Sequence, residues 1–132
     1  MFEPELAEEL SRRYPYARFR DVDGYSTVDL SGRYSTDDPD EEALCWFNEG
    51  HGCILGDSKP FECSAWPLRV MRRNGRLVVA LSPGCRVVSS RPVAEIQRLV
   101  DEGTGEKIFA YARKVPAFVR EYREDYIILK EE

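Results

Sequence analysis

The sequence predicts a small α+β domain that takes up all of residues 1–132. Two observations lead to this fold class. Segments 17–30 and 68–82 each place β-prone residues on both sides of a tight-turn pair, and segments 92–103 and 104–123 carry apolar residues at helical spacing. The length of 132 residues fits one domain with its own core. We therefore expect β-hairpins, C-terminal helices and an irregular, cysteine-bearing centre.

The first 30 residues predict a helix followed by a hairpin. Residues 4–13 have apolar side chains at helical spacing and an acidic first turn, and this helix should stop before Pro15. Residues 17–30 form two β-prone halves separated by Asp23 and Gly24. This pair favours a tight hairpin turn, because both central residues must tolerate positive φ.

The next region is predicted to be irregular. Residues 32–39 have the composition of a loop, and Asp38 is a candidate N-cap with Pro39 at the first helical position. A short helix would then lead into Cys45. Between residues 48 and 67 the glycines and prolines break the pattern, so backbone turns should dominate.

The second hairpin is the clearest element of the sequence. Strand-forming residues occupy 68–82, with Asn74 and Gly75 at the turn. A helix should then begin at Pro92 and end near Gly103.

The last part of the chain predicts a longer helix and a β-prone tail. Residues 104–123 carry an apolar stripe that Pro116 should bend or divide, and residues 126–129 favour a strand. The apolar faces of the two C-terminal helices would pack on the sheets or, in the alternative, bind a protein partner.

Charge argues against a nucleic-acid-binding protein. The formal net charge is −5, so no generally basic surface is indicated. Positive charge is local, and four arginines surround the second predicted turn: Arg69, Arg72, Arg73 and Arg76. We interpret them as the solvated face of a hairpin, with an anion or RNA contact as the alternative.

The sequence also predicts a cytoplasmic protein without a membrane span. The acidic start is not followed by the apolar stretch of a signal peptide. The longest apolar runs, such as 77–81, are far shorter than the roughly 18 residues that cross a bilayer. Cytoplasmic thiols stay reduced, so cysteines there indicate metal or redox chemistry more than disulfides.

The four cysteines are the most informative residues for function. They stand at Cys45, Cys53, Cys63 and Cys85, within 41 residues, whereas the other 91 residues contain none. A tetrahedral zinc ion takes four thiolates, and so does a [4Fe–4S] cluster. The sequence therefore predicts one metal centre held by all four cysteines, with zinc as the first choice and iron or an iron–sulfur cluster as the alternative.

Other interpretations of the cysteines stay open. The chain has no Cys-x-x-Cys pair, so it contains neither a zinc knuckle nor a thioredoxin motif. The cysteines could instead be buried, inert residues or form disulfides. His51, the single histidine, lies two residues before Cys53 and could be a ligand, an outer-shell residue or a surface residue.

Short motifs around the cysteines resemble those of the YkgJ-type cysteine-cluster family, which is described as zinc- or iron-chelating. The elements stand in this order: Cys45-Trp46-Phe47, Gly52-Cys53-Ile54-Leu55, Lys59-Pro60-Phe61-Glu62-Cys63, Trp66-Pro67-Leu68 and Pro83-Gly84-Cys85. They cover about residues 44–86, one third of the chain. The resemblance implies a chelated metal at these cysteines.

The chain departs from that family at two places. Members commonly begin with a further cysteine-rich element, but the corresponding residues 17–30 contain no cysteine, and Ser64 stands where an arginine is usual. The resemblance therefore implies a reduced ligand set of four. The flagellin lysine methylases are similar to this family, but nothing in this chain resembles a methyl-donor pocket.

Three functions follow from these features. The first is a metal-binding protein with a structural or sensory centre. The second is a redox or metal-dependent enzyme, whose helper residues would be His51, Asp57, Glu62 and Arg69. The third is a protein-interaction module with structural cysteines.

Overall fold

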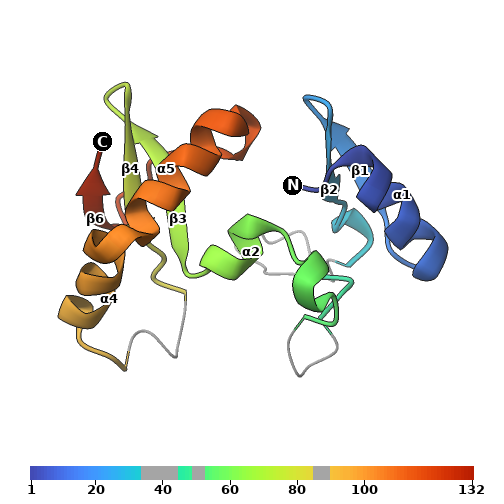
Figure 1. The fold of residues 1–132 in the computed structure, drawn as a ribbon, viewed down its shortest axis with the longest axis horizontal. Coiled ribbons are helices and arrows are strands. Elements are labelled where there is room, and N and C mark those ends of the chain that lie inside the picture. The colour runs from blue at the N-terminus through green and yellow to red at the C-terminus, as the bar shows by residue number, and fades with distance from the viewer. Residues whose placement is uncertain (34–44, 49–52, 85–89) are drawn as a thin grey trace. The chain divides into compact units, whose positions relative to one another are not determined.

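A computed structural model shows the fold of the chain (Figure 1). It describes residues 1–33, 45–48, 53–84 and 90–132. The chain folds as two compact units, Met1–Pro60 and Phe61–Glu132. Both contain helices and antiparallel hairpins, and the second adds a parallel strand pair. The predicted α+β class is thus confirmed, while the expectation of a single domain stays a prediction.

The first unit opens with helix α1, Pro4–Arg13, at the predicted bounds. Pro4 occupies the start of the helix, where its missing N–H costs no hydrogen bond. Ala7 and Leu10 are its buried residues. Tyr14 follows as the C-cap and has left the helical conformation, because a residue that precedes a proline disfavours it.

The first predicted hairpin is also confirmed. Strands β1, Phe19–Val22, and β2, Tyr25–Val28, pair antiparallel. The two turn residues Asp23 and Gly24 have φ values of 52° and 83°. Positive φ at both positions is the geometry that the Asp-Gly pair predicts.

An aromatic cluster forms the centre of the first unit. Phe47 is only 1% exposed, and three rings surround it edge-on or tilted: Phe2 at 6.3 Å, Tyr14 at 5.5 Å and Phe19 at 6.0 Å between ring centroids. These rings come from the N-terminus, the end of α1 and β1, so Phe47 fixes its own segment to all three. The other buried residues of this core are Ala7, Leu10, Ala17 and Leu55.

A four-stranded sheet with the order β5-β3-β4-β6 organises the second unit. Strands β3, Leu68–Arg73, and β4, Arg76–Leu81, form the predicted hairpin, with Asn74 and Gly75 at φ 53° and 78°. Strand β6, Ile127–Glu131, pairs antiparallel with β4 and confirms the β-prone tail. Strand β5, Arg120–Glu121, pairs parallel with β3.

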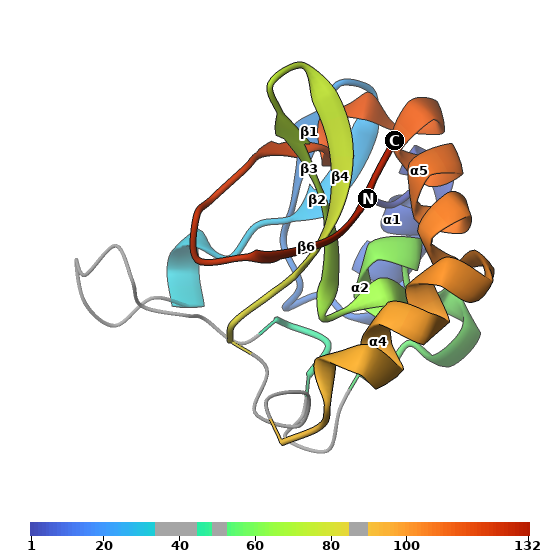
Figure 2. The same cartoon turned by 90° about the vertical axis from the view of Figure 1, so that its left-hand side faces the viewer.

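The two faces of this sheet carry different neighbours. Met71, Val78 and Ala80 lie on one face and form a buried cluster with residues that follow β5 and begin β6. Val70 and Val79 alternate onto the opposite face, where helix α5 contacts β3 and β4 (Figure 2). Burial on both faces explains why the middle of β4 is apolar at every position.

Two helices precede the last strands. Helix α4, Val93–Leu99, continues through a π-helical turn at Val100–Thr104 into helix α5, Gly105–Lys114. Gly103 breaks the helical path at φ 133°, close to the predicted end of the first helix. Two apolar residues of α4, Val93 and Leu99, are 44% and 51% exposed.

The predicted C-terminal end of the second helix, at residue 123, is wrong. The helix ends at Lys114, and Pro116–Phe118 forms a 3₁₀ turn. Proline lacks the N–H for the next helical hydrogen bond, so the chain leaves the helix there and continues into β5.

The middle of the chain differs from the sequence prediction in one respect. Residues 61–65, expected to be turns, form the short helix α2, Phe61–Ala65. Short 3₁₀ turns stand at Ser31–Arg33 and Gly56–Ser58. The helix predicted to begin at Asp38 and Pro39 lies outside the described residues. Among the described helices, none has the length and apolar character needed to cross a membrane.

Candidate metal centre

Cys45 and Cys53 belong to one local loop of the first unit. The backbone of Asn48 pairs with that of Cys53 in an isolated antiparallel bridge. The Ile54 N–H donates to the Phe47 carbonyl at 2.9 Å, and the Asn48 N–H donates to the Cys45 carbonyl at 3.0 Å. Backbone pairing therefore joins the segment that carries Cys45 to residues Cys53 and Ile54.

The surroundings of this loop hold Cys45 in place. Its side chain is half-buried against the aromatic core, and Phe47 anchors the segment two residues further on. The Trp46 Nε1–H donates to the Asp29 carbonyl at 2.6 Å, and the Arg33 guanidinium lies 4.6 Å from the centre of the Trp46 ring. Cys53, by contrast, is exposed.

Cys63 lies in the second unit, on helix α2, and its side chain is exposed. Two contacts fix α2 to α5. The Phe61 ring lies 4.8 Å from that of Tyr111, and the Tyr111 hydroxyl donates to Glu62 Oε2 at 2.9 Å. Glu62, a helper candidate of the enzyme hypothesis, is half-buried and holds this helix contact.

The predicted ligand set is only partly covered by the described structure. Cys85 and His51 lie outside the described residues. Among the residues that are described, no three His, Cys, Asp or Glu side chains come together as a metal-binding group. The described cysteines are accessible or half-buried, so the expectation of buried, inert cysteines does not fit Cys53 or Cys63.

The remaining helper candidates occupy separate elements. Asp57 is exposed in the 3₁₀ turn Gly56–Ser58, and Arg69 is half-buried on β3. Burial lowers the pKa of the Arg69 guanidinium, and the positive charge of Arg120 lowers it further, whereas the Tyr126 and Cys63 side chains oppose the shift. Arg69 thus lies within electrostatic range of Cys63.

Sequence reasoning missed Arg120 and Tyr126 as partners of Arg69. Arg120 was placed in a helix that extended to residue 123, and there it would not have met β3. Pro116 was the signal that could have placed Arg120 correctly, because a helix that ends before this proline leaves the residues after it free to pair with a strand.

Comparison with known proteins adds no assignment. No protein-family model matches the chain, and neither the curated proteins nor the solved structures include a match.

Proposed function

We propose that this chain is a metal-binding protein that holds one metal centre through Cys45, Cys53, Cys63 and Cys85. The observation that carries the proposal is the gathering of all four thiols within 41 residues. Zinc is the proposed metal, with iron or a [4Fe–4S] cluster as the alternative, because four thiolates suit each of them.

The surroundings of the described cysteines support the proposal. The bridge pairs Cys53 with Asn48, three residues after Cys45, which supports the proposal that these two cysteines contribute to the same centre. The exposed side chains of Cys53 and Cys63 leave their sulfurs accessible to an incoming ion. The resemblance of the surrounding motifs to a cysteine-cluster family points to the same chemistry.

The proposal includes the role of the centre and the cellular compartment. We assign the metal a structural or sensory role, since bound metal contributes folding free energy to the irregular segment that carries the cysteines. A cytoplasmic location belongs to the same proposal, because thiolate ligands must stay reduced.

Metal analysis of the anaerobically purified protein tests this function. We expect a colourless protein with one zinc ion per chain, or a brown protein with visible absorbance if the centre is an iron–sulfur cluster. Serine at any one of the four cysteine positions should leave the metal sub-stoichiometric. His51→Ala should retain the metal, because four thiolates complete the coordination.

A matched control separates ligand loss from a general effect of the substitution. Ala65→Ser introduces the same side chain on the same helix as Cys63→Ser, and it should keep the full metal content. Wild-type protein that carries no stoichiometric metal after anaerobic handling would contradict the proposal. So would cysteine variants that bind as much metal as the wild type.

A further inference from the structure

A small cavity on the sheet of the second unit is lined by two arginines and a tyrosine. It has a volume of about 60 Å³, and its walls come from β3, the turn before β5, β5 itself and the residue that precedes β6. The lining residues are Arg69, Val70, Met71, Phe118, Arg120 and Tyr126. A single water needs roughly 10–15 Å³ by the same measure, so the cavity has room for a small oxyanion.

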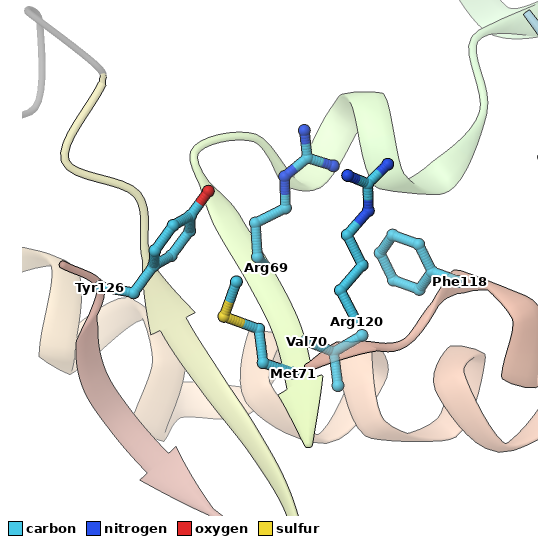
Figure 3. A pocket seen from close by; sticks show the side chains of 6 residues that line it. All are labelled: Arg69, Val70, Met71, Phe118, Arg120 and Tyr126. Atoms are coloured by element: carbon cyan, nitrogen blue, oxygen red, sulfur yellow. The ribbon is translucent and has the colours of Figure 1, made fainter. Parts of the chain in front are cut away.

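The two guanidinium groups and the tyrosine hydroxyl of this cavity lie toward the same end of it. Figure 3 shows the side chains of Arg69 and Arg120 next to each other, with both guanidinium groups on the same side, and the Tyr126 hydroxyl on the other flank of Arg69. Val70, Met71 and Phe118 form the apolar floor and wall. Two forked donors and one hydroxyl thus surround a partly enclosed space.

The charge of this cavity is uncompensated within the part of the chain that the structure describes. There, neither Arg69 nor Arg120 forms an ion pair with a carboxylate, and Arg69 is held by the face of Trp66, 4.8 Å from the ring centre. Arg69 is also half-buried, and its pKa is lowered by that burial and by Arg120. A half-buried Arg69 beside a second positive charge favours an anion that joins the two guanidinium groups.

A second cavity on the same sheet shows the contrast. It is larger, about 410 Å³, and is lined by Arg72 and Arg73, but Glu121 and Glu124 line it as well. Its lining therefore contains carboxylates as well as arginines. The first cavity has two arginines and no carboxylate in its lining.

We propose that Arg69, Arg120 and Tyr126 form a binding site for a phosphate-type dianion, with the two guanidinium groups as forked donors and the Tyr126 hydroxyl as a third donor. Guanidinium forks match the oxygens of phosphate in a bidentate manner. Two arginines balance a doubly charged group, which favours phosphate over a carboxylate. The cavity is too small for a nucleotide, so only a free phosphate or the phosphoryl group of a larger molecule enters it.

Titration of the full-length protein with inorganic phosphate, followed by amide chemical shifts, tests the site. We expect saturable shifts at residues around the cavity, and Arg69→Gln and Arg120→Gln should each weaken binding about tenfold or more, as expected for the loss of a charge-assisted hydrogen bond. Tyr126→Phe should weaken it only a few-fold, because the lost bond is neutral on the protein side.

Matched variants make this test decisive. Arg72→Gln removes the same charge from the same strand but outside the cavity, and it should leave phosphate affinity within about twofold of the wild type. Arg120 is exposed, so Arg120→Gln remains informative if Arg69→Gln fails to fold. Arg120→Gln should keep the metal content of the wild type, so a loss of phosphate binding in this variant belongs to the arginine site and not to the metal centre.

Three probes identify the ligand class. Acetate should bind far more weakly than inorganic phosphate. Glycerol 2-phosphate that binds at least as well as phosphate would assign the site to the phosphoryl group of a larger molecule, and weaker binding would assign it to free phosphate. The proposal is overturned if acetate competes equally, if Arg72→Gln weakens binding as much as Arg69→Gln, or if phosphate causes no saturable shift.

Discussion

At the scale of single residues, Asp29 joins the first hairpin to the loop that carries Cys45. Its carboxylate accepts the backbone N–H of Ser31 at 2.9 Å, and its carbonyl accepts the Trp46 indole N–H. The backbone hydrogen bond from Ser31 is the largest cause that lowers the pKa of Asp29 below 3.8, and the Ser31 side chain adds to the effect. The ionised carboxylate is therefore the form that the fold favours.

This shift predicts a pH dependence with a defined sign. Because the folded pKa lies below the unfolded one, the stabilisation is present above the unfolded pKa and is lost as the pH falls through the folded pKa. Carbon-detected NMR titration should find that the pKa of the Asp29 carboxyl group lies below its usual range. Ser31→Ala, which keeps the backbone donor, should move the pKa only part of the way back, and a wild-type pKa at or above 3.8 would contradict this account.

At the scale of elements, helix α5 supports the second unit through one apolar face. Ile108, Phe109 and Ala112 are buried, whereas Lys107 is exposed on the other side. Phe109 is only 1% exposed. This face contacts the sheet, so α5 couples the helical part of the unit to β3 and β4.

Truncation of this face should destabilise the second unit strongly. Phe109→Ala removes a buried ring and should lower the free energy of unfolding by about 3–5 kcal/mol. Lys107→Ala, two residues away on the exposed side, should change it by less than about 0.5 kcal/mol. Chemical denaturation of both variants measures the difference, and equal stabilities would refute the role of this face.

The elements also show which features can be predicted from sequence. Both hairpins were predictable because Asp23-Gly24 and Asn74-Gly75 supply the two positive φ angles that their turns require. The helix Phe61–Ala65 was not, since five residues are too few for a helical pattern to repeat. The end of α5 was misplaced because the apolar stripe continues beyond Pro116, although the helical hydrogen bonds do not.

At the scale of the whole molecule, the sequence predicts which residues form the candidate site better than it predicts where they lie. The count and clustering of cysteines identify a chemistry, because thiolate donors suit only a few metals. Where the cysteine side chains lie in space depends on tertiary structure, which their separation along the sequence does not predict. Cys45 and Cys53 belong to the first compact unit and Cys63 to the second.

X-ray absorption spectroscopy of the metal-loaded protein is the most direct test of this centre. For zinc, we predict a single shell of four sulfur atoms at about 2.3 Å. For the cluster alternative, we predict an iron edge with sulfur ligands and a short iron–iron distance. A first shell dominated by nitrogen or oxygen, or one with fewer than three sulfurs, would contradict the assignment of Cys45, Cys53, Cys63 and Cys85 to one metal centre.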